Sequence, residues 1–168
     1  VMLHGALNSP NYQEQMQENM AAISNVFGGK KYLPSFDAYI PDGSAYAYAS
    51  SHPNTKLLRQ LYEKVDISVS GVGALYPECD SALSNPLMAG DPAISEFLQE
   101  QKPCGDILLR FFDQNGQECK VGHGVRVTAI EFDTYRKIPT KFVVAAGEKK
   151  ARACIGAVRG GLVDVLII

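Results

Sequence analysis

Three short runs of small residues follow apolar stretches and could bring backbone N–H groups close to a bound anion. They are Gly5-Ala6-Leu7-Asn8, Gly71-Val72-Gly73 and Ala146-Gly147-Glu148. Small side chains let backbone amides approach a ligand closely, and the free N–H groups and dipole at a helix start favour negative charge. A glycine after a strand can also be a plain turn, so each run alone leaves both interpretations open. Together the three runs favour a site for a polar or anionic ligand.

Two charged side chains stand near these runs and could contact the same ligand. Lys150 lies in the first turn or so of a helix predicted after Gly147, where a cation opposes the helix dipole unless an anion joins it. The alternative for Lys150 is a solvated lysine, like its neighbour Lys149. Asp106 follows Gly105 at the start of a strand-like run, where its carboxylate could accept hydrogen bonds from sugar hydroxyls or cap a turn.

The remaining reactive residue types are too dispersed to form a familiar catalytic or metal site. The four cysteines include no CxxC pair, and the three histidines make no metal-ligand spacing. The run Gly71-Val72-Gly73 lacks the third glycine of a dinucleotide fingerprint, because Tyr76 occupies its place. Asp106 and His123 are the only candidates for an acid–base pair, and nothing in their spacing connects them. We therefore expect no catalytic residue, no metal ion and no cofactor.

The composition is that of an ordinary globular domain without a footprint for nucleic acid. The chain has 168 residues, of which 46% are apolar and 20% charged, a length that suits one domain. Its net charge is −2 and its 16 basic residues are scattered, so this stretch by itself is not expected to bind DNA. No apolar run approaches the ~20 residues of a membrane helix. The cysteine pattern suits a reducing cytoplasm.

The apolar spacing predicts helices alternating with strands. Helices are expected to begin at Pro10, at Pro53 and at Pro92, and to cover residues 132–137 and 148–158. Asn115-Gly116 predicts a hairpin turn, because both residues tolerate positive φ. Strands are expected over residues 1–4, 31–33, 66–70, 107–112, 142–145 and 162–168, with 36–51 as an irregular loop.

Several of these strands are continuous apolar runs, which favours a parallel sheet covered on both faces. We therefore predict an α/β fold with one open, mostly parallel sheet, a Rossmann-like three-layer arrangement and a small antiparallel hairpin inserted. Ligands of such sheets bind at the carboxyl ends of the strands. The chain begins with Val-Met-Leu and ends with Val-Leu-Ile-Ile inside predicted strands, so we expect it to be a segment of a longer protein.

A series of motifs follows in a fixed order along nearly the whole chain, most specifically in its last third. The motifs are Asp66, Gly71-Val72-Gly73, Gly105-Asp106-Ile107, Phe111-Phe112-Asp113, Gly116, Arg126, Ile138-Pro139, Ala146-Gly147-Glu148-Lys149-Lys150 and Arg159-Gly160-Gly161-Leu162-Val163-Asp164-Val165-Leu166. Their order and spacing resemble the sugar-binding domain of SorC-type bacterial transcriptional regulators, which are often grouped with the DeoR family.

This resemblance implies a fold like that of sugar-phosphate isomerases and a domain that senses a sugar or phosphosugar. Gly5 to Asn8 would form the first ligand loop and Gly71 to Gly73 the second. Asp106 would stand at the family's acidic ligand position, and Lys150 at its helix-borne lysine, just after Gly147. The chain departs from the family pattern at Ala146, where the first glycine of a pair is usual, and the Thr-Asp and helix that usually follow are missing after Ile168.

The expected function is effector sensing within a cytoplasmic regulator of sugar operons. Residues 1–168 would be a single effector-binding domain, and operator DNA would be bound only through a helix-turn-helix domain absent from this chain. The resemblance also implies a homo-oligomer. Effector binding would favour one of two conformations or assemblies. The alternative is a phosphosugar isomerase-like enzyme of the same fold, since fold alone does not determine function.

Overall fold

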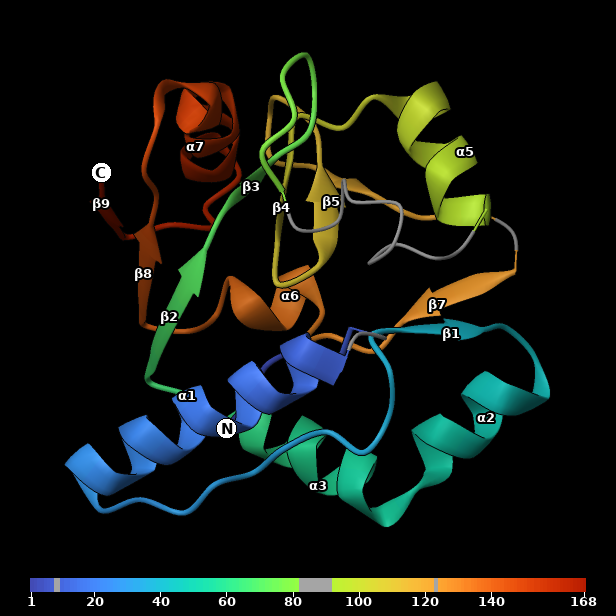
Figure 1. Ribbon diagram of the computed structural model, residues 1–168, viewed down its shortest axis with the longest axis vertical. Coiled ribbons are helices and arrows are strands. Elements are labelled where there is room, and N and C mark those ends of the chain that lie inside the picture. The colour runs from blue at the N-terminus through green and yellow to red at the C-terminus, as the bar shows by residue number, and fades with distance from the viewer. Residues whose placement is uncertain (8–9, 82–91, 123) are drawn as a thin grey trace.

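The predicted helices begin at or close to the residues where proline and the apolar spacing place them. Figure 1 shows how they are arranged around the strands. The structure, a computed structural model, describes residues 1–7, 10–81, 92–122 and 124–168. At the second of these helices, His52 accepts a hydrogen bond from the Asn54 N–H through Nδ1 at 3.2 Å, and Pro53 occupies the first turn. The predicted helices are α1 (Pro10–Phe27), α3 (Pro53–Tyr62), α5 (Pro92–Gln101), α6 (Phe132–Tyr135) and α7 (Ala151–Arg159), the last preceded by a 3-10 turn, η2 (Glu148–Lys150).

The predicted parallel sheet is present and has three strands. They are β2 (Ile67–Gly71), β8 (Thr140–Val144) and β9 (Val165–Ile167), in the order β2-β8-β9. Both pairs of neighbours are parallel. The carboxyl end of β2 runs directly into Val72 and the next strand, so the Gly71 to Gly73 run follows a strand as predicted.

Antiparallel pairing is more extensive than the sequence predicts. A four-stranded sheet has the order β3-β4-β5-β6, and a two-stranded sheet pairs β1 with β7. The predicted α/β class is confirmed, but the prediction of one mostly parallel sheet with a small hairpin is wrong, because more of the described strands pair antiparallel than parallel. The strands of the two antiparallel sheets are β3 (Gly73–Ala74), β4 (Gly105–Ile107), β5 (Arg110–Phe112), β6 (Glu118–Cys119), β1 (Tyr39–Pro41) and β7 (Val125–Val127).

The predicted strand over residues 107–112 is wrong, because the chain reverses within it. Leu108 and Leu109 adopt φ angles of 53° and 65°, and they turn β4 back onto β5. Positive φ is uncommon for leucine, so nothing in the residue types signals this turn. Every residue of both strands is buried, which makes the run look like one continuous apolar strand. By contrast, the hairpin predicted at Asn115-Gly116 is confirmed between β5 and β6, with Gly116 at φ 71°.

Three further assignments near the N-terminus are also wrong. The stretch 36–51 is not an irregular loop but contains β1 and a helix, α2 (Ser44–Ser51), which begins after Gly43 at φ 88°. Residues 1–4 and 31–33 are not strands. A single hydrogen bond of 3.0 Å from the Met2 N–H to the Tyr32 carbonyl joins them, and an isolated bridge pairs Ala6 with Asp37. Apolar character alone does not make a strand, because sustained pairing also needs a neighbouring strand in register.

The four-stranded antiparallel sheet lies between two apolar clusters, and neighbouring residues of β5 point into different ones. Phe112 belongs to the larger cluster, which also contains side chains of β8, α6 and α7. Its neighbour Phe111 points to the other face and packs with Phe97 of α5, at a ring separation of 5.1 Å, and with Leu7. Among the described residues, no helix is both long and apolar enough to span a membrane.

Candidate functional site

A cavity of about 900 Å³ opens at the carboxyl end of β2. It is lined by the Gly71 to Gly73 run, by Asp106 of β4 and by Lys150 of η2. Residues of α1 and the whole length of β2 also line it. The structure thus brings together residues that are 33 or more positions apart in the sequence and that the sequence analysis selected separately. The location agrees with the rule that ligands bind beyond the carboxyl ends of parallel strands.

Asp106 is a buried carboxyl group that accepts a short hydrogen bond from a serine. Its side chain is only 7% exposed, and its Oδ1 accepts a hydrogen bond from Ser81 Oγ at 2.6 Å. Burial raises the pKa of Asp106 to about 6, while the Ser81 hydrogen bond and the positive charge of Lys150 lower it. The group is therefore ionised at neutral pH, where it can accept hydrogen bonds from ligand hydroxyls, and gains a proton under mildly acidic conditions.

Gly73 provides the space that Asp106 and Ser81 occupy. It pairs with Asp106 in the β3–β4 register, and a Cβ added at Gly73 would overlap Asp106 Oδ1 and lie 2.5 Å from Ser81 Oγ. Gly71 is different, because an added Cβ there would meet no atom closer than the Val144 carbonyl oxygen at 3.9 Å. The two glycines of the run therefore have different roles, and only Gly73 is required sterically by the site.

Lys150 supplies a positive charge to the cavity. It is the last residue of η2 and precedes the first residue of α7, after a turn in which Gly147 adopts φ 96°. Within the described part of the chain it forms no ion pair with a carboxylate at 4.0 Å or less, although its charge acts on Asp106. Its neighbour Lys149 is exposed and does not line the cavity. An ammonium group beside the N-terminus of α7 is suited to an anionic ligand group.

His4 and Tyr12 are among the cavity residues that the sequence analysis missed. His4 is 8% exposed, and its Nδ1 lies 2.8 Å from the Gly5 carbonyl oxygen. That oxygen can only accept, so Nδ1 carries the proton and Nε2 of the neutral ring is an acceptor. Burial lowers the pKa of His4. Burial raises the pKa of Tyr12, and the negative charge of Asp106 raises it further. Both side chains are therefore neutral at pH 7. The only signal for His4 was its position directly before the Gly5 run.

A known domain family matches the whole chain. All of residues 1–168 match the family model described as "Putative sugar-binding domain". The chain belongs to this sugar-binding domain family. The resemblance to SorC-type regulators inferred from the motifs is thereby confirmed.

Solved structures of regulators share the fold of this sugar-binding domain. A DeoR family transcriptional regulator from Listeria monocytogenes superposes with a TM-score of 0.78 at 22% identity, over 97% of this chain and 64% of that one. The full-length sorbitol operon regulator SorC from Klebsiella pneumoniae superposes with a TM-score of 0.70 at 21% identity. The match covers 80% of this chain and 42% of that one. The deoxyribonucleoside regulator of Bacillus subtilis is 34% identical over 71 residues, which are 42% of this chain and 23% of that protein. This chain spans less than two thirds of each of these relatives.

Other residues selected from the sequence lie outside the cavity lining. Gly5, Ala6 and Leu7 are buried, and Leu7 belongs to the smaller apolar cluster of the sugar-binding domain. A Cβ added at Gly5 would lie 2.7 Å from the Ala38 backbone, so this glycine allows two chain segments to approach closely. Gly147 lies in a separate apolar groove along α7, and Asn8 falls outside the described residues. Ligand contact by Gly5, Ala6, Leu7, Asn8 and Gly147 stays a prediction.

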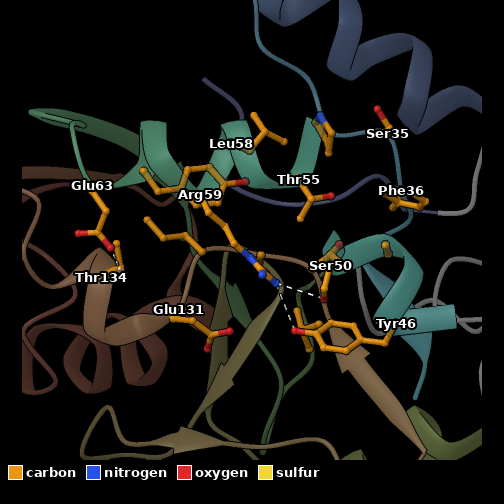
Figure 2. Close-up of a pocket in the computed structure, with 17 residues that line it drawn as sticks. Ser35, Phe36, Tyr46, Ser50, Thr55, Leu58, Arg59, Glu63, Glu131 and Thr134 are labelled. Carbon is orange, nitrogen blue, oxygen red and sulfur yellow. Dashed lines mark hydrogen bonds between the residues drawn. The ribbon is translucent and has the colours of Figure 1, made fainter. Parts of the chain in front are cut away.

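A second, smaller pocket of the sugar-binding domain lies away from the strand ends (Figure 2). It has a volume of about 180 Å³ and lies between α2, α3 and the segment that leads into α6. Arg59 reaches across it toward the Tyr46 hydroxyl at 3.5 Å and the Ser50 hydroxyl at 3.3 Å, as the dashed lines in Figure 2 show. None of the residues selected from the sequence lines this pocket, so the larger cavity is the candidate ligand site.

Proposed function

We propose that this sugar-binding domain senses a sugar or phosphosugar effector in the cavity at the end of β2. The observation that carries the proposal is that one cavity contains a buried carboxylate, Asp106, and a lysine without an ion-pair partner among the described residues, Lys150. Gly73 leaves the space that this carboxylate and Ser81 occupy. Sugar hydroxyls need acceptors and donors, and a phosphate needs a cation, and the cavity supplies both kinds of group.

Each group has a distinct role in the proposed complex. Asp106 accepts hydrogen bonds from sugar hydroxyls, and its own bond from Ser81 holds the carboxylate in place. The neutral ring of His4 offers Nε2 as a further acceptor. Lys150 acts as a point charge toward a phosphate, supported by the start of α7. A free sugar would use the first two groups without the third.

The domain is proposed to bind its ligand without converting it. The relatives named above are regulators, which supports a sensing role. Of the acid–base pair nominated from the sequence, His123 falls outside the described residues. The alternative of an isomerase-like enzyme would need a placed acid and base beside the ligand carbon. Within the longer protein, the parallel sheet with α7 on one face supports a Rossmann-like three-layer arrangement similar to that of sugar-phosphate isomerases.

The remaining expectations concern the whole regulator. Residues 1–168 are proposed to form its effector-binding domain, with a helix-turn-helix domain outside this chain contacting operator DNA. A homo-oligomer in the cytoplasm is the assembly that we propose for the full protein. The net charge of −2 and the absence of a basic cluster in the sequence support the view that this part does not contact DNA directly.

A thermal-shift panel of free and phosphorylated hexoses, hexitols and pentoses tests the proposal. A ligand at a hundredfold excess over its Kd stabilises the folded state by about 2.7 kcal/mol, which is about 5–10 °C for a domain of this size. One sugar or phosphosugar should produce this shift, and inorganic phosphate at the same concentration should produce much less. A panel in which no sugar exceeds inorganic phosphate would refute the proposed function.

A further inference from the structure

The smaller pocket, which we call the Arg59 pocket, has walls of packed apolar and aromatic side chains. Its buried lining residues are Ala49, Leu58, Tyr62, Ala129 and Ile130. Phe36 also lines it, and the Phe36 ring is held edge-on by the rings of Tyr48 at 5.9 Å and His52 at 5.2 Å. Such walls are preformed, as they are in most small-molecule sites.

Arg59 supplies the one positive charge among the residues that line this pocket. Figure 2 shows its side chain running from α3 across the pocket toward Ser50 and Tyr46 of α2. The two hydrogen bonds to these hydroxyls are long, and both start from Nη2. Nε and Nη1 donate to no acceptor in the described part of the chain, so the planar fork that matches a carboxylate is uncommitted.

The two carboxylates that line the same pocket have other partners. Glu131 Oε1 lies 2.8 Å from Nη2 of Arg110, whose side chain is only 6% exposed. Glu63 accepts a hydrogen bond from the Thr134 hydroxyl at 3.4 Å. No ion pair of the described residues includes Arg59. Its charge is therefore available to a ligand, whereas the two carboxylates disfavour a ligand with more than one negative charge.

We propose that the Arg59 pocket binds a small monocarboxylic acid with an apolar body, at a site separate from the sugar cavity. The pocket volume is about 180 Å³, and an apolar cavity of about 150 Å³ accommodates a benzene ring. The carboxylate accepts hydrogen bonds from the Arg59 guanidinium, and the apolar body lies against Leu58 and Ile130. Among the described residues, none lines both this pocket and the cavity at the end of β2, so the two ligands do not compete for space.

Equilibrium dialysis of the native, full-length protein against radiolabelled benzoate tests the inference. Benzoate is a monoanion at pH 7 with a ring of the right size, and benzamide is its uncharged isostere. We expect one saturable benzoate site per chain with a Kd of about 1 mM or tighter, and benzamide should compete at least about 10-fold more weakly. Absence of saturable binding, or equal competition by benzamide, overturns the inference.

Three variants locate the bound benzoate. Arg59→Gln removes the charge at similar length and should weaken binding about 10- to 150-fold. Arg152→Gln is the matched control, because Arg152 is also exposed, makes one long hydrogen bond of 3.4 Å to Gln114, and lines neither cavity. Lys150→Ala reports on the sugar cavity. Neither control should change the Kd of benzoate by more than about twofold.

The pattern among the variants decides between the sites. A loss of benzoate binding in Lys150→Ala places the anion in the sugar cavity, and equal losses in Arg59→Gln and Arg152→Gln indicate a general effect of charge. Either result overturns the inference. Since no effector takes part in these measurements, a protein that binds benzoate through Arg59 but responds to no sugar refutes the proposed function alone.

Discussion

Replacing Gly73 by alanine probes the arrangement of the candidate site most directly. The backbone of Gly73 does not have a positive φ, so alanine is tolerated there by the main chain. The added methyl group would overlap Asp106 Oδ1 and lie 2.5 Å from Ser81 Oγ, so the pair must separate to make room for it. The bond that is lost is a 2.6 Å hydrogen bond to a buried carboxylate, worth about 1.5–3 kcal/mol. Overpacking a filled site costs a similar amount, about 1–3 kcal/mol.

Gly71→Ala is the matched control, two residues away in the same run. Its methyl group would meet nothing closer than 3.9 Å, and its φ is also not positive. Restricting the unfolded chain should make this variant more stable by about 0.4–1 kcal/mol. Urea unfolding should thus show opposite signs for the two variants. Calorimetric titration should show effector affinity reduced about 10- to 150-fold in Gly73→Ala and nearly unchanged in Gly71→Ala. Equal effects at both positions would mean that Gly73 does not shape the site.

Three further predictions follow from the same cavity. Lys150→Ala should weaken binding of a phosphorylated effector by about 10- to 150-fold, as measured by calorimetry, whereas Lys149→Ala should not; equal effects would make Lys150 an ordinary surface lysine. The pKa of Asp106 is raised from its ordinary 3.8 to about 6 in the folded protein. The folded state therefore holds this proton more tightly than the unfolded state, and the resulting stabilisation is complete below pH 3.8 and is lost as the pH rises through 6. Asp106→Asn should therefore be more stable than the unchanged protein by about 3 kcal/mol at pH 7 and equal to it at pH 3.5, and a pH-independent difference in urea unfolding would contradict this. No isomerised product should accumulate in NMR spectra of the protein with phosphosugars, and a product rate proportional to protein concentration would establish an enzyme.

The sequence by itself determined the elements that depend on a few neighbouring residues. Proline in the first turn and a 3.6-residue apolar period are local signals, so α1, α3 and α5 were predicted with the correct starts. Branched apolar runs gave β2, β8 and β9, whose continuous apolar character is typical of parallel strands. The sequence also selected Asp106, Lys150 and the run ending in Gly73, which the structure places in one cavity.

Only the tertiary structure decided how these elements pair and which side chains meet. The turn at Leu108 and Leu109 is invisible in the sequence, because leucine does not favour positive φ and the strands on both sides are buried. Ser81 reaches Asp106 across 25 positions, and His4 enters the cavity from the other end of the chain. Residue propensities describe the backbone energy of short segments. Which side chains line a cavity depends instead on how segments that are distant in the sequence pack together. That is why the sequence could select Gly73 as a loop glycine, but only the fold shows that its missing side chain is the space occupied by Asp106 and Ser81.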